Sequence, residues 1–160
     1  MAVAEVLDFP GPERVDDGSV RAAVDVVLHR LRDLPVDDAA AQARTAIQRL
    51  EMAETEMVAR KLDSGASPDA ARKAAGAGGD RSKRDADKVA KRADACRQNP
   101  ALSDEANNGN LSTGQLDAIA DAAARTDGDA ATDPELLDRV KATDNPDQAR
   151  AAVRAWEDAR

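Results

Sequence analysis

Apolar side chains recur every three or four residues along two long stretches of the chain, which is the spacing of one face of an α-helix. The first stretch begins near Ser19 and ends before Pro35, because the residue before a proline is disfavoured in the α region. Its apolar stripe consists of Val20, Ala23, Val24, Val27, Leu28, Leu31 and Leu34. The second stretch runs from about Asp38 to Asp63, with a stripe of Ala39, Ala43, Ala46, Ile47, Leu50, Ala53, Met57, Val58 and Leu62. We predict two long helices whose stripes pack on other helices or on a partner.

Local start and stop signals predict further helices after residue 63. A short Ala-rich element over 68–75 is followed by a glycine-rich hinge at 76–79, and a helix over roughly 80–98 stops at Asn99-Pro100. The clearest start is at Ser112, which has the S-x-x-Q spacing of a capping box with Gln115 and a hydrophobic staple from Leu111 to Leu116. Asp133-Pro134 and Asn145-Pro146 each place a capping side chain before proline at the first helical position. These signals predict an all-α fold with a long central helix and no β-sheet.

The same signals suggest a domain organisation. Residues 1–18 are interrupted by proline and glycine and predict a flexible tail, so residues 19–160 are expected to form one helical domain. The last helix reaches Arg160 without a glycine or proline cap, which indicates a chain cut within an element.

Composition narrows the kind of core that such helices can form. Of 160 residues, 36 are Ala, whereas Leu, Val, Ile and Phe together number only 26. That share is below the roughly 20% that, with a high net charge, is a sign of disorder. Alanine has the highest helix propensity, however, and the apolar periodicity falls between recognisable caps. We therefore expect a thin, Ala-lined helical assembly.

Several compartments and protein classes are disfavoured. The first ten residues have neither a basic segment nor an apolar run typical of a secretory signal, and no run approaches the ~20 apolar residues that cross a bilayer. Cys96 is the single cysteine, so a reducing cytoplasm is the expected location. The net charge of −8 disfavours a general nucleic-acid coat or a membrane-surface protein.

One segment departs from this acidic balance. Residues 72–97 carry nine basic and four acidic side chains, a net of +5, which leaves −13 for the rest of the chain. On a helical wheel, five bases share one stripe, and Ala86, Val89, Ala93 and Cys96 form an apolar stripe on another face. The five bases are Arg81, Arg84, Lys88, Lys91 and Arg92. Two interpretations are open: the stripe contacts the phosphate backbone of DNA without reading bases, or it is a solvated face that pairs with acidic side chains of the chain itself.

The remaining reactive side chains do not assemble into a catalytic or metal site. His29 is the single histidine and is expected at the surface, and Cys96 on an apolar stripe is expected to be a small buried side chain. Asp127-Gly128-Asp129 lacks the closing glutamate of a calcium loop, and the glycines at 76–79 lack the lysine of a phosphate loop. Glu54 falls within the apolar stripe of its helix, where it either specifies helix register or marks a partly exposed position. We predict no catalytic residue, metal or cofactor.

From about Val36 to Arg160, the order of elements resembles a known family, the helical domain of unknown function that precedes HNH endonuclease domains in high-GC bacteria and their phages. The segments that carry the resemblance are Met57–Leu62, Ala70–Gly76, the basic helix, Asn99–Leu102, Gly109–Ala123 and Arg154–Glu157. Within Gly109–Ala123, this chain has the family's "G-x-L-S-x-x-Q…I-A-x-A" pattern.

The resemblance implies a nuclease-associated helical accessory domain of bacteria or phages that is itself non-catalytic; on the first interpretation of the five bases, its basic helix contacts the DNA backbone. Family members that carry a nuclease have, downstream of this domain, a ββα metal site built from two histidines and an asparagine. The sequence up to Arg160 contains no such module, and its one histidine, His29, lies in the wrong place. HNH activity is therefore expected only if the gene continues. The alternative function is a structural or oligomerisation protein that buries its stripes against a copy of itself or a helical partner, with no nucleic-acid role.

Overall fold

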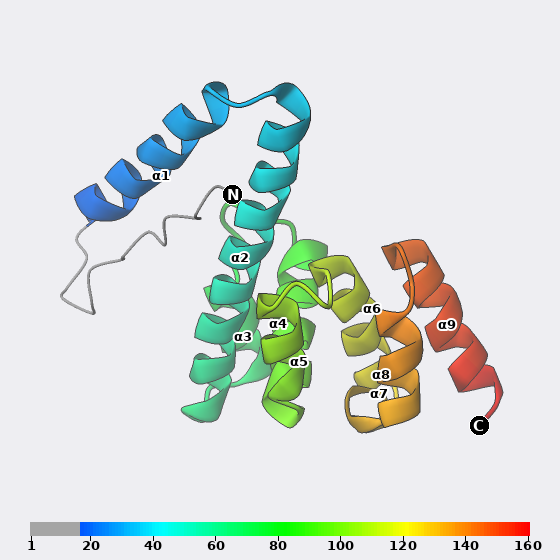
Figure 1. Cartoon of the computed structure of the whole chain (residues 1–160). Helices are drawn as coiled ribbons and strands as arrows, with labels where there is room; N and C mark the ends of the chain where they lie inside the picture. Colours follow the sequence, from blue (N-terminus) through cyan, green and yellow to red (C-terminus); the bar gives the residue numbers. More distant parts are fainter. Residues whose placement is uncertain (1–16) are drawn as a thin grey trace. The chain divides into compact units, whose positions relative to one another are not determined.

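A computed structural model describes residues 17–160 of the chain, and this part is all-α as predicted (Figure 1). It contains no β-strand; an isolated β-bridge joins Ala77 and Arg81. The helices are α1 (Asp17–Arg32), α2 (Val36–Asp63), α3 (Pro68–Ala74), α4 (Lys83–Gln98), α5 (Ala101–Asn107), α6 (Thr113–Ala123), α7 (Asp129–Thr132), α8 (Pro134–Lys141) and α9 (Pro146–Asp158). Within these described residues, no helix has the length and apolar character needed to span a membrane.

The span 19–160, predicted as one domain, contains two compact units that divide within α2. The first unit ends at Arg44, and the second comprises Thr45–Arg160. Most of the predicted tail lies outside the described residues, and its last two positions, Asp17 and Gly18, already belong to α1.

The local signals placed several helix starts correctly. The hydroxyl of Ser112 accepts the backbone N–H of Gln115 at 3.2 Å, and the Gln115 Oε1 accepts the N–H of Ser112 at 2.8 Å, so the capping box is complete. Asp133 and Asn145 cap α8 and α9 with their side chains. The helix predicted from residue 80 begins instead at Lys83, because Ser82 adopts an extended backbone and caps the N–H of Asp85.

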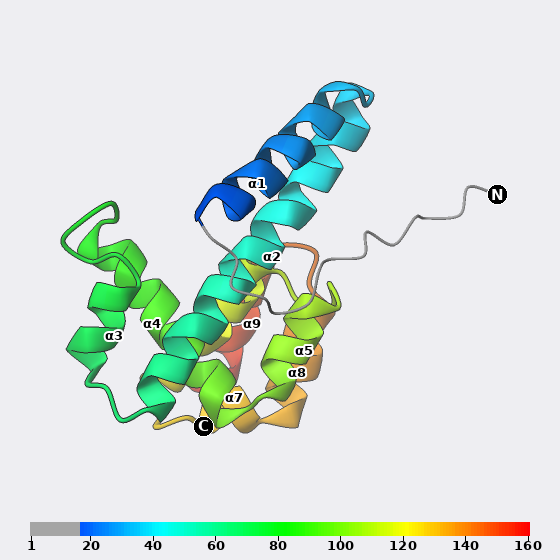
Figure 2. The ribbon, with the colours of Figure 1, turned by 90° about the vertical axis from the view of Figure 1, so that its left-hand side faces the viewer.

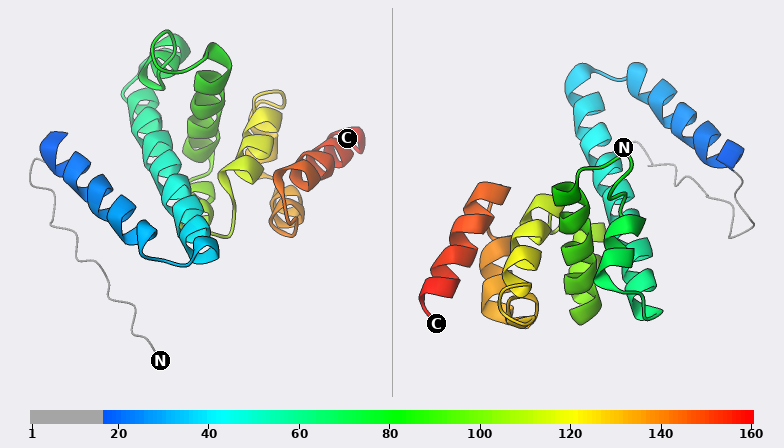
Figure 3. Two further views of the ribbon diagram at one scale, coloured as in Figure 1. Left: turned by 90° about the horizontal axis from the view of Figure 1, so that it is seen from above. Right: turned by 180° about the vertical axis from the view of Figure 1, so that it is seen from behind.

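The second unit has a large core and a small one. In the large core, α6 packs against α4 and α9, and α8 packs on both α6 and α9. In the view from behind, α6 lies between α4 and α9 (Figure 3). Leu116, Ile119, Leu136 and Trp156 are buried there among numerous alanines. The small core joins the end of α2 to α3 and α4, which lie side by side (Figure 2). Small side chains let these short helices approach closely, as expected for a thin core.

The face that α2 buries agrees only in part with the predicted one. Met52, Thr55 and Val58 are its buried residues, whereas Ile47 and Leu50 of the predicted stripe are exposed. The stripe of α1 is also largely exposed. The periodicity predicted the helix and part of its buried face, because Val58 and Leu62 of the stripe pack in the small core. The rest of that face is contributed by Met52 and Thr55, which lie outside the predicted stripe, and its contacts are polar as well as apolar. One such contact comes from Gln48, whose Nε2 donates to the carbonyls of Ala106 and Leu111 at 3.0 and 2.9 Å.

Candidate functional site

Helix α4 carries the predicted cationic stripe and lies between α3 and α6. Its apolar stripe of Ala86, Val89, Ala93 and Cys96 is buried, as the sequence predicted. The cationic side is divided between the protein interior and the surface, so each of the five bases has to be considered separately.

Arg92 is buried, which corrects the expectation that it faces solvent. Only 6% of its side chain is exposed, and its guanidinium forms an ion pair with Asp117 of α6 at 2.8 Å. It also donates to the hydroxyl of Thr55 on α2 at 3.5 Å. Burial raises the pKa of the Asp117 carboxyl, and the adjacent Arg92 opposes that increase. Arg92 is therefore a structural residue that links three helices.

Three other bases of the stripe form ion pairs with carboxylates of the same chain. Arg81 pairs with Glu54 on α2 and donates to the carbonyl of Ala75 at 3.1 Å. Lys91 bridges Asp87 on its own helix and Asp121 on α6, each at 3.1 Å. Lys88 lies 3.6 Å from Asp85. Glu54, the unexplained polar residue within the α2 stripe, is thus a partner for the loop before α4.

Arg84 is the one member of the five that is exposed, and within the described residues its side chain has no ion pair or hydrogen bond. Lys83 beside it is also exposed. The structure therefore does not bring the five predicted residues together as a free cationic face. Four of them have the internal pairing that the second interpretation of this segment describes, and DNA contact stays a prediction.

The segment predicted as a hinge, 76–79, forms a hydrogen-bonded turn. Gly76 and Gly78 have φ of +93° and +83°, which L side chains rarely adopt. The carbonyl of Gly76 accepts the N–H groups of Gly79 and Arg81 at 3.2 and 3.3 Å. This turn places Arg81 against Glu54.

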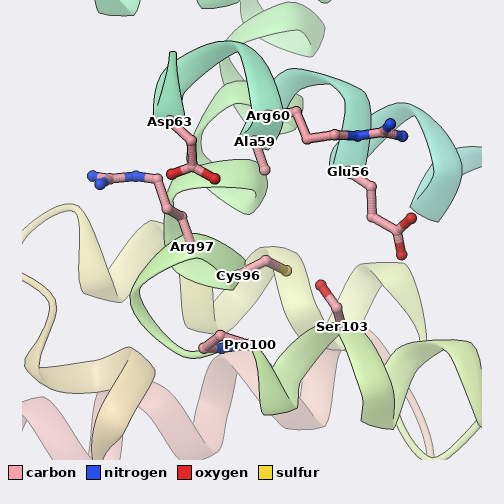
Figure 4. A pocket seen from close by; sticks show the side chains of 8 residues that line it. All are labelled: Glu56, Ala59, Arg60, Asp63, Cys96, Arg97, Pro100 and Ser103. Atoms are coloured by element: carbon pink, nitrogen blue, oxygen red, sulfur yellow. The ribbon is translucent and has the colours of Figure 1, made fainter. Parts of the chain in front are cut away.

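A pocket of about 360 Å³ lies between the end of α2 and the α4–α5 connection (Figure 4). The Cys96 thiol and the Ser103 hydroxyl point toward each other across its floor, while Glu56 and Arg60 line its α2 side. Burial raises the pKa of the Cys96 thiol, so the thiol stays protonated at neutral pH and is a poor nucleophile. Cys96 is buried, as expected, and no histidine lines this pocket.

A second pocket of about 400 Å³ is a groove lined mainly by alanines of α3, α4 and α6, including Ala71, Ala90 and Ala123. Arg72 and Lys91 border this groove, and Asp87 forms an ion pair with each of them. No group of three or more His, Cys, Asp or Glu side chains within residues 17–160 is arranged to hold a metal ion. His29 on α1 is exposed, as predicted, and lies 4.0 Å from Asp33.

The most distinctive surface feature is apolar. On α2, Val36, Ile47, Leu50 and Met57 have exposed fractions of 83%, 56%, 64% and 58%. On α1, Val20, Val24, Val26, Val27 and Leu28 are all at least 40% exposed. Large apolar side chains are few in this sequence, yet nine of them are exposed on these two helices.

Comparison with protein-family models, curated proteins and solved structures found no match to this chain. The resemblance to the HNH-associated domain therefore stays a prediction.

Proposed function

We propose that this chain is a helical protein-interaction module whose binding surface is formed by the apolar faces of α1 and α2. The supporting observation is the exposure of nine large apolar side chains on these helices, in a chain that has few of them. Several large apolar side chains exposed along one face of a helix typically mark an interaction site, and α1 and α2 each carry such a face. Scattered single residues would carry no such meaning.

The spacing of the exposed residues supports a helical partner. Ile47, Leu50 and Met57 follow one another at intervals of three and seven residues, and Val20, Val24 and Val27 at four and three. Intervals that alternate between three and four residues are the seam of a helix that packs against another helix at a shallow angle. A 16-residue helix such as α1 is marginally stable alone in water, so it gains from such packing.

This function is tested by asking whether the two faces are open to another molecule. We expect the chain alone to bind the dye ANS and the α1 amides to exchange hydrogen rapidly. Val24→Asp and Ile47→Asp should reduce dye binding. The proposal is wrong if a concentration-independent monomer binds no dye and protects the α1 amides, because the faces are then closed within one chain.

Contact with DNA as an accessory domain is a second candidate, supported by the net charge of +5 on residues 72–97 and the exposure of Lys83 and Arg84 at the first turn of α4. Titration of duplex DNA at two salt concentrations tests it. Each phosphate contact contributes about −0.9 to the log–log salt slope, so contact by all five predicted bases gives about −4.5. Internal pairing of four bases predicts a shallower slope, lost in Lys83→Ala/Arg84→Ala. Absence of binding at low salt would contradict the DNA role.

A further inference from the structure

We infer that the partner of the α2 face is an acidic amphipathic helix of another protein, which packs along residues 46–61 and sets its carboxylates beside exposed bases of α2. This inference rests on the proposed function and names the chemistry of the partner. All the residues that form this part of the face belong to the second unit, Thr45–Arg160. Two features support it, the shape of the exposed apolar seam and the sign of the charges beside that seam.

The outer face of α2 carries an apolar seam in which small and large side chains alternate. Its members, which are separated by four, three and four residues, are Ala46, Leu50, Ala53 and Met57. Leu50 and Met57 are 64% and 58% exposed, Ala53 is exposed between them, and Ile47 lies at one edge of the seam. An alanine between two large side chains leaves a hole that a large side chain of a partner helix can fill. The seam therefore favours a helix with large apolar residues on one side as its occupant.

The exposed charges beside this seam are basic. Arg49, Arg60 and Lys61 are exposed, and within the part of the chain that the structure describes their side chains form no ion pair or hydrogen bond. On a helical wheel, Arg49 and Arg60 flank the seam on one side, and Lys61 continues it one turn beyond Met57. Asp63, an exposed carboxylate of the same helix, lies about 120° around the helix from Met57. The flanks of a docked helix therefore lie closest to bases.

The glutamates of the same stretch contact the body of the second unit instead. All three are half-buried, and each carboxylate has a donor within the unit. Glu51 accepts the Thr113 hydroxyl at 2.6 Å, Glu54 pairs with Arg81, and Glu56 accepts the Asn107 amide at 2.9 Å. Charges farther away are screened over about 8 Å at physiological ionic strength, so the net charge of −8 does not cancel the local effect of the exposed bases. An acidic helix is complementary to this face, whereas a basic helix is repelled.

Two synthetic helical peptides, each of about 18 residues or five turns, test the charge of the partner. Both carry leucine along one seam, and they differ only at the flanking positions, which are all glutamate in one peptide and all lysine in the other. Fluorescence anisotropy of the labelled peptides with the full-length chain measures each Kd. The glutamate peptide should bind at least about tenfold more tightly, as expected for ion pairs with three bases at the rim of an interface. This preference should shrink as salt is added.

Reversing the charge beside the seam should reverse the preference. Arg49→Glu/Arg60→Glu should weaken binding of the glutamate peptide about tenfold and strengthen binding of the lysine peptide. Lys73→Glu/Arg154→Glu is the matched control, because it makes the same change in net charge at two exposed bases on α3 and α9 whose side chains have no ion pair within residues 17–160. The control should leave both Kd values unchanged. Equal effects of the two double variants would overturn the assignment of the partner's charge to this face.

The hole at Ala53 provides a test that does not depend on charge. Ala53→Phe adds apolar area but fills the hole, so both peptides should bind about tenfold more weakly while the chain still binds ANS. Ala74→Phe is the matched control, because Ala74 is an exposed alanine at the end of α3, away from the seam. Unchanged peptide binding by Ala53→Phe would overturn the seam as the docking site.

The remaining outcomes separate this inference from the function on which it rests. Equal affinity for the two peptides, or ANS binding by a chain that binds neither peptide, would overturn the acidic helix and leave the interaction module standing. A dimer in sedimentation equilibrium that the glutamate peptide does not dissociate would do the same, because a second copy then occupies the face. A chain that binds neither peptide nor dye would overturn both, because the face is then closed within one chain.

Discussion

Replacing Arg92 by methionine should strongly destabilise the second unit, although Arg92 lies in the most basic segment of the chain. The substitution keeps a long aliphatic side chain but removes the charge that compensates Asp117. Arg92 is 6% exposed and Asp117 is 20% exposed, so little water can replace the lost guanidinium. An uncompensated charge then remains between α4 and α6.

The size of the effect follows from this burial. Breaking a buried ion pair by removing one partner costs about 3–5 kcal/mol, and the partial exposure of Asp117 places the expected loss near the lower value. For a chain of this length, that corresponds to a decrease in Tm of about 6–12 °C. Arg97→Met is the matched control, because Arg97 lies on the same helix and its pair with Asp94 is at the surface. That pair should contribute at most about 1 kcal/mol.

Thermal unfolding followed by circular dichroism measures both variants, and the pH dependence identifies the cause. Burial raises the pKa of Asp117, and loss of Arg92 raises it further. An acid with a raised folded pKa favours folding when protonated, so the penalty of Arg92→Met should shrink as pH falls from 7 toward the unfolded pKa near ~4. Arg92→Met/Asp117→Leu should recover most of the lost stability. Equal losses in Arg92→Met and Arg97→Met, or a penalty independent of pH, would refute the reasoning.

Three further substitutions test other contacts of the second unit. Gly114→Ala should cost about 1–3 kcal/mol in urea unfolding, because its Cβ would lie 2.5 Å from Cγ of Pro146, while Gly79→Ala, whose Cβ meets nothing closer than 3.8 Å, should be tolerated. Ser112→Ala removes the cap of α6 and should cost about 1 kcal/mol in the same assay; no loss would show that the cap is dispensable. Asp133 has a lowered pKa because it accepts a backbone N–H at the start of α8, so its contribution is present above its unfolded pKa of about 4 and is lost as pH falls through its folded value. Asp133→Asn should therefore be less stable than the natural chain at pH 7 and lose less stability on acidification, as followed by thermal unfolding.

The sequence predicted most of the helices because their signals are local. The cap at Ser112 and the Asp133-Pro134 and Asn145-Pro146 starts depend on residues within one turn, so they survive any tertiary arrangement. The four-residue helix α7 was not predicted. It follows Gly128, whose φ is +95°, and the spacing of apolar residues carries no information about such a backbone conformation.

Burial was less predictable than helicity. An apolar stripe predicts that a face will be covered, but not by what or from which side. Met52 and Thr55 of α2 are buried against the second unit, while Ile47 and Leu50, the stronger hydrophobic signal, are exposed. Of the predicted stripe on α2, Val58 and Leu62 pack in the small core, whereas Ile47, Leu50 and Met57 are exposed.

The cationic stripe shows the same limit for charges. A helical wheel groups Arg81, Lys91 and Arg92 correctly on α4, but their partners Glu54, Asp121 and Asp117 lie 27, 30 and 25 residues away. Those carboxylates sit on helices whose approach to α4 no sequence pattern specifies. Counting charges by segment therefore overstated the free positive charge of this surface.

The Gln115 side chain restricts which sequences can encode this fold. The capping box accepts glutamate or glutamine equally well, because either supplies an oxygen for the Ser112 N–H. Here the other end of the amide, Nε2, donates to the carbonyls of Val140 and Thr143 and to the Thr143 hydroxyl, at 2.8 to 3.1 Å. A carboxylate would set negative charge against two carbonyl oxygens in a buried position. Among descendants of this sequence, glutamate at position 115 should thus be selected against although the helix start alone would permit it, and spontaneous deamidation there would be a lesion rather than a silent change.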